Sequence, residues 1–341
     1  MRSIGRSRDL GQGVDVAARQ GAASHTLRHP TGTHVRAVAI VGPTSVGKTR
    51  LALRLATLLN AEIVCADSRQ VYRYLDIGTG KPTQAERGAV SHHLLDVVPP
   101  DEDFDAAKFA RLARQAIRDI NARGRRVIIC GGSGLYVRAL LNGLFPGPKA
   151  DRALRRRLVQ EHEAGGPGLL HRRLASRDPE AAARLHPHDL VRVIRALEVY
   201  ELTGRPLSEL QRAHESPEPP CFAMTIGLWR ERDALRTAIA SRCAAMVAGG
   251  LVEEVRGLWM RGYGPQLAPL TTLGYRHMGA HLLGERTLAD ALAEMTLDTC
   301  RYAKRQLTWF RSDPRCRWFH AEREEGIAIA AARRFIEGDE G

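Results

Sequence analysis

The chain has 341 residues, of which 44% are hydrophobic, enough for one large domain with an insertion or for two domains. No apolar run is long enough to span a membrane, and the six scattered cysteines lack a C-x-x-C pair, so we expect neither a disulfide framework nor a zinc site. The formal net charge of +13 favours a polyanionic partner, nucleic acid first, although an arginine-rich genome would also produce it. We expect a cytoplasmic protein with reduced thiols and no membrane partner.

Residues 1–34 contain arginine, glycine and serine but neither apolar periodicity nor the apolar core of a secretory signal. We interpret this segment as a disordered basic extension, or as the result of a start site placed too far upstream. It carries part of the positive charge, so the charge of the folded part is smaller than the total.

The next segment predicts a phosphate-binding loop between a strand and a helix. Residues 35–41 are mostly apolar and indicate a buried strand, and residues 51–59 place leucines on one helical face. Between them stands Gly42-Pro43-Thr44-Ser45-Val46-Gly47-Lys48-Thr49, which matches the P-loop pattern G-x-x-x-x-G-K-[ST]. Such a loop surrounds phosphate oxygens with backbone N–H groups at a helix N-terminus. Lys48 would add a charge, and the Thr49 hydroxyl a ligand for Mg²⁺.

Strands and helices then alternate, which predicts a parallel sheet. We expect strands at 61–66 and 126–130, a loop at 72–80 and a helix at 105–122. Asp67 follows the first of these strands, and a second glycine-rich loop, Gly131-Gly132-Ser133-Gly134, follows the other. Ligands of such sheets bind at the carboxyl ends of the strands, where both loops fall. Asp67 could act as a general base or assist Mg²⁺, or it could only cap the loop.

The pattern changes after Pro146-Gly147-Pro148. Residues 149–215 predict helices with clustered arginines and no strand, which indicates an inserted helical subdomain. Residues 222–228 predict a strand that returns to the sheet, and helices are expected at 231–248, 251–261 and 287–310. We therefore divide the chain into a P-loop core at 35–148 and 216–320, an insertion at 149–215 and a tail at 321–341.

Several further motifs occur in a fixed order with the P-loop. They are Asp67-Ser68-Arg69-Gln70-Val71-Tyr72, Asp76-Ile77-Gly78-Thr79-Gly80-Lys81-Pro82, His92-His93-Leu94-Leu95-Asp96, residues 131–136, residues 192–199, Gly274-Tyr275 and residues 303–310. In this order they resemble the bacterial tRNA dimethylallyltransferases over residues 36–320. The resemblance implies an α/β fold with a P-loop NTPase-like parallel sheet flanked by helices, and a monomer.

The resemblance also implies the reaction. The dimethylallyl group of dimethylallyl diphosphate moves to N6 of the adenosine beside the anticodon of a tRNA, and diphosphate leaves, with Mg²⁺ as cofactor. The implied catalytic residues are Asp67, Lys48 and Thr49, with Thr49 as the metal ligand, and the implied diphosphate site is the whole P-loop, residues 42–49, with Arg232. The implied tRNA contacts are Asp67, Ser68, Arg69, Gln70, Ser133, Arg155, Val191, Arg192, Val193, Ile194 and Arg195.

One position departs from the family pattern. The family usually shows R-x-x-L-x-x-R-I-x-x-R after the strand that ends here at Leu228, and Ala238 stands at the middle arginine, for which Arg236 could substitute. Three alternative functions stay open at this point: prenylation of free AMP, a small-molecule P-loop kinase, and a non-catalytic RNA-binding factor. His92 and His93 lack further ligands at metal-binding spacing, so we interpret them as structural or substrate-loop residues.

Overall fold

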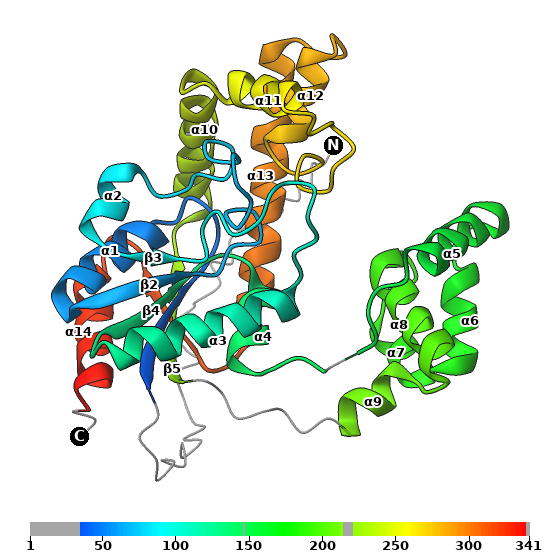
Figure 1. The fold of residues 1–341 in the computed structure, drawn as a ribbon, viewed down its shortest axis with the longest axis horizontal. Helices are drawn as coiled ribbons and strands as arrows, with labels where there is room; N and C mark the ends of the chain where they lie inside the picture. Colours follow the sequence, from blue (N-terminus) through cyan, green and yellow to red (C-terminus); the bar gives the residue numbers. More distant parts are fainter. Residues whose placement is uncertain (1–34, 146, 214–220, 339–341) are drawn as a thin grey trace, which may run out of the picture. The chain divides into compact units, whose positions relative to one another are not determined.

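The computed structural model describes residues 35–145, 147–213 and 221–338, so the predicted extension at 1–34 lies outside the described residues. Within these ranges the strands form one six-stranded sheet of parallel pairs, in the order β3-β2-β4-β1-β5-β6 (Figure 1). The strands are β1 Arg36–Val41, β2 Ala61–Cys65, β3 His92–His93, β4 Arg126–Cys130, β5 Phe222–Trp229 and β6 Cys316–His320. The prediction of a parallel sheet flanked by helices is confirmed.

The register of the central strands brings their carboxyl ends together. Ile40 in β1 and Cys65 in β2 both pair with Cys130, the last residue of β4. The segments that follow these strands therefore leave the sheet side by side at one edge. They are the P-loop, the segment that begins at Asp67 and the second glycine-rich loop.

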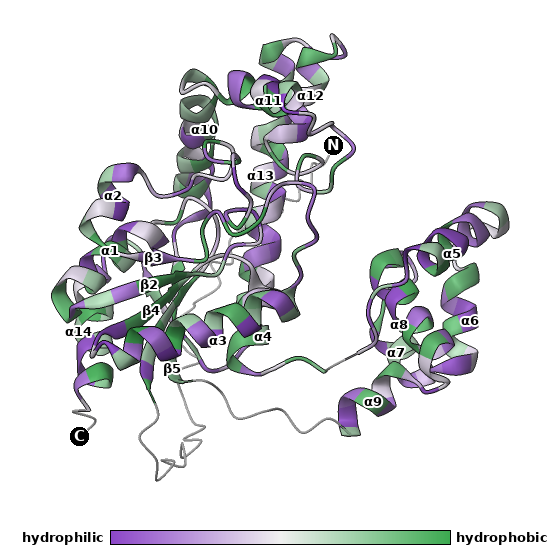
Figure 2. Cartoon of the chain, in the orientation of Figure 1, coloured by the Kyte–Doolittle hydropathy of each residue, from purple (hydrophilic) through white to green (hydrophobic). Residues whose placement is uncertain are grey.

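Helices cover the sheet, whose central strands are mostly hydrophobic in Figure 2 because neighbouring elements bury them. Helices α1 (Lys48–Leu59) and α14 (Glu325–Glu337) pack together against the sheet, as α3 (Ala106–Ala122) and α4 (Gly134–Leu141) do. Short helix α2 spans Gln84–Ala89. Residues 321–341, left as a tail by the sequence, thus include a helix, and its Ala328 and Ala332 are buried in the core.

Four further helices follow β5. They are α10 (Arg232–Ala248), α11 (Leu251–Met260), α12 (Tyr275–Leu282) and α13 (Leu288–Arg311), and α13 packs against both α10 and α12. Among the described residues, no single helix has the length and apolar composition to cross a membrane. Helices α10 and α11 meet those limits only as a pair, and the chain bends by 52° between them.

Among its described residues, the predicted insertion contains helices joined by short loops and no strand. It contains α5 (Arg152–Gly165), α6 (Leu169–Arg177), α7 (Pro179–Arg184), α8 (Leu190–Thr203) and α9 (Leu207–Ala213), and residues 214–215 lie outside the described ranges. These helices have an apolar core of their own, which includes Leu158, Leu174, Val193 and Leu197. The buried Asp178 carboxylate accepts hydrogen bonds from the Ala181 and Ser208 N–H groups and the Ser208 hydroxyl, which fixes α9 to α7. We refer to helices α5–α9 as the arm.

Candidate active site

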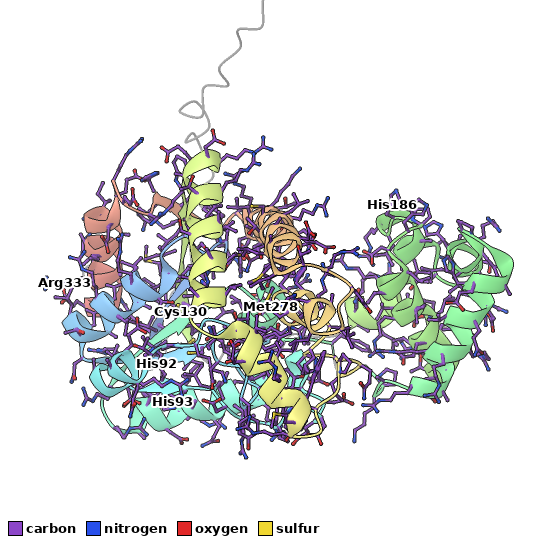
Figure 3. The ribbon with its side chains drawn as sticks, turned by 90° about the horizontal axis from the view of Figure 1, so that it is seen from above. His92, His93, Cys130, His186, Met278 and Arg333 are labelled. Carbon is purple, nitrogen blue, oxygen red and sulfur yellow. The ribbon has the colours of Figure 1, made fainter. Side chains whose placement is uncertain are left out.

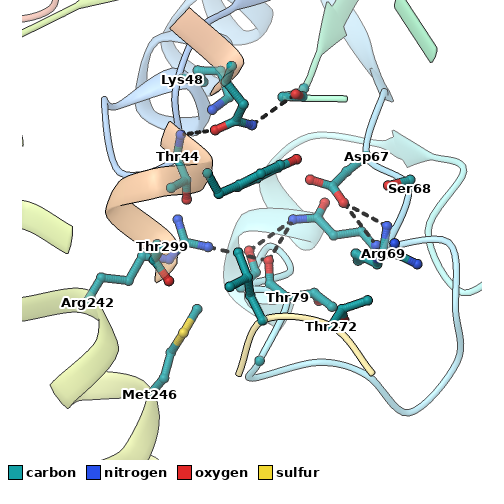
Figure 4. A pocket seen from close by; sticks show the side chains of 18 of the residues that line it. Thr44, Lys48, Asp67, Ser68, Arg69, Thr79, Arg242, Met246, Thr272 and Thr299 are labelled. Atoms are coloured by element: carbon teal, nitrogen blue, oxygen red, sulfur yellow. Dashed lines mark hydrogen bonds between the residues drawn. The ribbon is translucent and has the colours of Figure 1, made fainter. Parts of the chain in front are cut away.

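A cavity of about 670 Å³ lies where the loops after β1, β2 and β4 meet α10 and α13. The P-loop contributes Thr44, Lys48 and Thr49, and residues 67–70, 78–80 and 130–132 line another part of the wall. Figure 4 shows Lys48, Asp67, Arg242 and Thr299 around this space. The sheet edge predicted to bind ligands is therefore hollow, and its wall contains both polar and apolar side chains.

The P-loop backbone has a conformation that needs glycine. Gly42 has φ of 136°, and a Cβ there would lie 2.6 Å from the Leu228 carbonyl oxygen, so a side chain does not fit. Gly47 has φ of 107° and is the N-cap of α1. The Ser45 hydroxyl oxygen is buried with no hydrogen-bond partner among the described residues. A buried polar atom without a partner suits a ligand that can hydrogen-bond to it, such as a phosphate oxygen.

Lys48 and Arg242 are half-buried cations that face the cavity. Burial lowers the pKa of Lys48 to about 8, and the nearby Arg242 charge lowers it further, whereas Cys130 and Asp67 raise it. The pKa of Arg242 is also lowered by burial, although Asp67 raises it. The Lys48 ammonium donates to the Pro43 carbonyl oxygen at 2.7 Å, and Arg242 to the Thr79 carbonyl oxygen at 3.4 Å. No ion pair involves either side chain among the described residues, so the site favours an anionic ligand.

Asp67 caps its loop, as the sequence allowed, and also lines the cavity. Its Oδ1 atom accepts from the Arg69 N–H at 2.8 Å and the Gln70 N–H at 3.3 Å, which is the loop cap expected of an aspartate after a strand (Figure 4). The residue also lines the cavity, together with Lys48 and Arg242. The cap therefore holds a carboxylate in a fixed orientation at the cavity wall.

Gln306 joins the two glycine-rich loops, a role that the sequence analysis did not assign. Its buried side-chain oxygen accepts from the Thr44 N–H at 2.8 Å, and its nitrogen donates to the Gly132 carbonyl oxygen at 2.9 Å. A Cβ at Gly132 would lie 2.2 Å from that nitrogen, which explains the glycine. The sequence signals for this role are the place of Gln306 in the motif at residues 303–310 and an amide on the apolar face of a long amphipathic helix.

Glu254 fixes the loop at residues 76–80, and it was also missed. Its carboxylate accepts from three successive N–H groups, those of Asp76, Ile77 and Gly78, at 3.0, 2.7 and 3.1 Å. It also accepts from the Tyr275 hydroxyl at 2.7 Å. Because residues 78–80 line the cavity, this carboxylate on α11 shapes the cavity without lining it.

Known proteins resemble this chain over most of its length. A family model described as IPP transferase matches residues 70–313. The chain belongs to the IPP transferase family. It is 48% identical over 296 residues to the tRNA dimethylallyltransferase of Syntrophobacter fumaroxidans, covering 87% of this chain and 86% of that protein. It is 51% identical over 285 residues to that of Geobacter metallireducens, covering 83% and 92%.

Solved structures of the family share the fold. The tRNA isopentenylpyrophosphate transferase of Bacillus halodurans superposes with a TM-score of 0.66 at 39% identity, covering 89% of this chain and 97% of that one. A eukaryotic dimethylallyltransferase acting on tRNA gives a TM-score of 0.75 at 27% identity, covering 89% and 80%. The family resemblance and the fold class predicted from the sequence are confirmed.

The structure brings most predicted residues of the family core to the cavity. Ser68, Arg69 and Gln70 line it, and the Ser133 hydroxyl lies behind them, accepting from the Ser68 N–H at 2.9 Å. Arg232 is different: it is exposed in the first turn of α10 and does not line the cavity. Arg242, ten residues further on and ~15 Å along the helix at 1.5 Å per residue, is the α10 arginine at the site. Arg242 is therefore the α10 arginine placed to contact a ligand in this cavity, and the predicted contact of Arg232 with the diphosphate stays a prediction.

Ala238, where the family pattern has its middle arginine, is half-buried one turn before Arg242. Arg236 is exposed and does not line the cavity, so it does not substitute for that arginine in this structure.

His92 lines the same cavity as Cys130, and both are labelled in Figure 3. The neighbouring His93 binds the Glu62 carboxylate at 2.7 Å, in agreement with a structural role.

The predicted tRNA contacts on the arm differ in accessibility. Arg155 and Arg195 both bind the carboxylate of buried Glu198. Burial alone would raise the pKa of Glu198, but hydrogen bonds from these two arginines keep it below its usual value. The side chains of Val193 and Ile194 are buried in the arm core, so they hold the helix rather than face a ligand. Val191 and Arg192 are the exposed members of this segment.

Proposed function

We propose that this protein transfers the dimethylallyl group of dimethylallyl diphosphate to N6 of the adenosine adjacent to the anticodon in tRNA, releasing diphosphate. The observation that carries this proposal is a single cavity that contains a phosphate-binding loop, the half-buried cations Lys48 and Arg242 and an oriented carboxylate. A phosphate leaving group and a proton acceptor are the two things that this alkylation of an amine needs.

The P-loop side of the cavity would bind the diphosphate. Its backbone N–H groups, the Ser45 hydroxyl and the charges of Lys48 and Arg242 offer donors to phosphate oxygens. When the bond between the allylic carbon and oxygen breaks, its electron pair stays with the diphosphate. Donors that are already in place then stabilise the growing negative charge without having to reorganise.

Mg²⁺ fits the residues present. The Thr49 hydroxyl and the Asp67 carboxylate line the same cavity, and Mg²⁺ is usually held by one or two protein groups together with substrate phosphates and water. Thr49 would hold the ion, and the ion would neutralise charge on the departing diphosphate. The described residues contain no cluster of three histidine, cysteine or acidic side chains that could bind a metal, in agreement with a site that the substrate completes.

Asp67 would be the general base. The exocyclic amine of adenine is a weak nucleophile, and its nitrogen must lose a proton as it bonds to carbon. The backbone N–H groups that bind Oδ1 fix the carboxylate where it can take that proton, and general bases of this kind contribute ~10²–10⁴ in rate.

The tRNA would approach the cavity at residues 67–70, beside Ser133. The target base must leave its stack to reach an enclosed site, which costs a few kcal/mol and is easiest in a single-stranded loop. The exposed arginines of the arm, with Val191 and Arg192, would contact the backbone of the anticodon stem. The transfer reaction itself does not need the arm, whereas binding a tRNA stem would use a helical insertion of this size.

Mass spectrometry of tRNA nucleosides tests the proposal. After incubation with the protein, Mg²⁺ and dimethylallyl diphosphate, we expect one adenosine beside the anticodon to gain a five-carbon group. Turnover of ATP without a prenyl donor, or prenylation of AMP in preference to tRNA, would overturn the assignment. Unaltered tRNA that nevertheless binds would indicate a non-catalytic RNA-binding factor.

A further inference from the structure

Helix α13 presents a second side chain to the cavity that the proposed reaction does not yet use. Tyr302 lies about one turn before Gln306, and both line the cavity. Gln306 is hydrogen-bonded to the P-loop through the Thr44 N–H. The phenol end of Tyr302 lies near Ser133 and the Asp67 carboxylate. Tyr302 therefore lines the same cavity as the phosphate-binding loop and the carboxylate.

The surroundings of Tyr302 keep its phenol neutral. Burial raises the pKa of Tyr302 to about 12 and the nearby Asp67 charge contributes, whereas Arg69, Arg305 and the Ser133 hydroxyl act in the opposite direction. The group is thus protonated at neutral pH and is not a second base. What Tyr302 offers the cavity is its aromatic ring. That ring already attracts one cation, because the Arg305 guanidinium carbon lies 5.7 Å from its centroid.

The transfer step creates positive charge in this part of the cavity. As the bond from C1 of the dimethylallyl group to the diphosphate oxygen breaks, the electron pair leaves with oxygen, and positive charge spreads over C1 and C3. The N6 lone pair then forms the new bond to C1, and the N6 proton goes to Asp67. Lys48 and Arg242 would repel the allylic charge, so an uncharged wall group that attracts it would add to the attraction of the diphosphate and the Asp67 carboxylate.

We infer that the Tyr302 ring contacts the dimethylallyl group and stabilises the positive charge that develops on it during transfer. The negative face of an aromatic ring attracts a cation without competing as a nucleophile or as a strong hydrogen-bond acceptor. The inference rests on the proposed function, because it concerns the donor that the P-loop holds. It adds a catalytic residue on α13 to those on the P-loop and after β2.

Two substitutions separate the ring from its hydroxyl. Tyr302→Phe keeps the ring, so we expect a single-turnover rate within about threefold of the natural protein. Tyr302→Leu keeps an apolar side chain but loses the ring, and we expect the rate to fall about tenfold, since a desolvated cation–π contact supplies an effect of that order. Dissociation constants for tRNA and dimethylallyl diphosphate should stay within twofold, because the charge exists only in the transition state.

A fluorinated series gives the sharper test. Phenylalanine with one, two or three ring fluorines at position 302 keeps the shape but progressively weakens the negative face of the ring. The logarithm of the single-turnover rate should then fall stepwise with each fluorine. A ring that only fills space would give rates that do not follow fluorine number, and this result would overturn the inference even if Tyr302→Leu does not fold.

Tyr263→Leu is the matched control, because Tyr263 is also half-buried and packs against an aromatic ring, that of Tyr74, but does not line the cavity. Its rate should be unchanged.

The natural protein is measured first, and if it forms no prenylated adenosine the proposed function fails, whatever Tyr302 does. If the natural protein is active and Tyr302→Leu is equally fast at saturation, the inference fails alone. Weaker tRNA binding at an unchanged saturated rate would also overturn it, because the ring would then stack on a base.

Discussion

One substitution can separate the loop-cap role of Asp67 from its proposed role as general base. Asp67→Asn keeps an oxygen that can accept from the Arg69 and Gln70 N–H groups, but it removes the proton acceptor. We expect the single-turnover rate to fall by roughly 10²–10⁴, while the affinities for tRNA and prenyl donor stay within a few-fold. Rapid-quench kinetics and equilibrium binding on the same variant measure the two effects.

The same two measurements on Asp67→Asn also distinguish a rival role for this carboxylate, which is to act through Mg²⁺. If the carboxylate acts mainly through Mg²⁺, donor affinity should weaken together with the rate. Near-normal turnover by Asp67→Asn would exclude both roles and leave Asp67 as a loop cap.

Lys48 gives the site a pH dependence whose direction follows from its environment. The pKa of Lys48 is lowered to about 8, chiefly by burial, so the ammonium is charged below that pH and loses its proton above it. Because the charged form binds phosphate oxygens, the affinity for dimethylallyl diphosphate should fall as the pH rises from 7 to 9. Isothermal titration calorimetry across this range measures the change.

Lys48→Met is the reference for this experiment. It should bind the donor weakly and with little change between pH 7 and 9, because it has no proton to lose. A donor affinity of the natural protein that stays constant over the same range would contradict the role assigned to the Lys48 charge.

At the scale of elements, local patterns predicted the strands and helices that build the sheet edge. The strand at 126–130 has the predicted bounds, and β1 begins one residue later than expected. β3 was missed because its two residues are too few to show a period. α14 was missed because it follows the last family motif, and its burial depends on packing against α1.

The missed site residues share a different cause. Gln306 contacts Thr44, which is 262 residues away, and Glu254 contacts residues 76–78 across about 177 residues. Local periodicity carries no information on such pairs. Arg242 stands at the last arginine of the family pattern R-x-x-L-x-x-R-I-x-x-R, but only the structure shows that it, and not Arg232, reaches the cavity.

The loop at residues 76–80 should depend on Glu254. Glu254→Gln replaces one accepting oxygen with an N–H donor, which then faces backbone N–H groups or the Tyr275 hydroxyl. Leaving such groups unsatisfied costs about 1–3 kcal/mol. We expect urea unfolding to show a loss of that size, and hydrogen exchange to become faster at the Ile77 and Gly78 amides.

Glu253→Gln is a control on the same helix. Glu253 is exposed and forms an ion pair with Arg256, so its substitution should leave stability within about 0.5 kcal/mol and leave exchange at residues 76–78 unchanged. Equal effects of the two substitutions would show that Glu254 does not anchor the loop.

At the scale of the whole molecule, net charge is a poor measure of the surface available to RNA. Many arginines of the arm are already paired: Arg157 and Arg173 both bind Glu161 and Glu201, and Arg155 binds Glu198. These pairs stabilise the arm rather than offer free charge. Arg156 and Arg172 are exposed and form no ion pair within the described residues, so they are the better candidates for phosphate contacts.

The salt dependence of tRNA binding tests this distinction. Each phosphate contact releases counterions and adds ~0.7–0.9 to the slope of log affinity against log salt concentration. If Arg156 and Arg172 each contact a phosphate, the double substitution Arg156→Ala with Arg172→Ala should lower that slope by about 1.5 and weaken binding most at low salt. Fluorescence anisotropy with a labelled anticodon stem-loop at several salt concentrations measures both quantities.

Arg205→Ala is the matched control, because Arg205 is an exposed arginine of the arm that is paired with Glu209, and its removal should leave the slope unchanged. An unchanged slope for the double variant would mean that these two arginines do not contact the tRNA backbone, and an equal loss for Arg205→Ala would mean that ion pairing does not decide which arginines do.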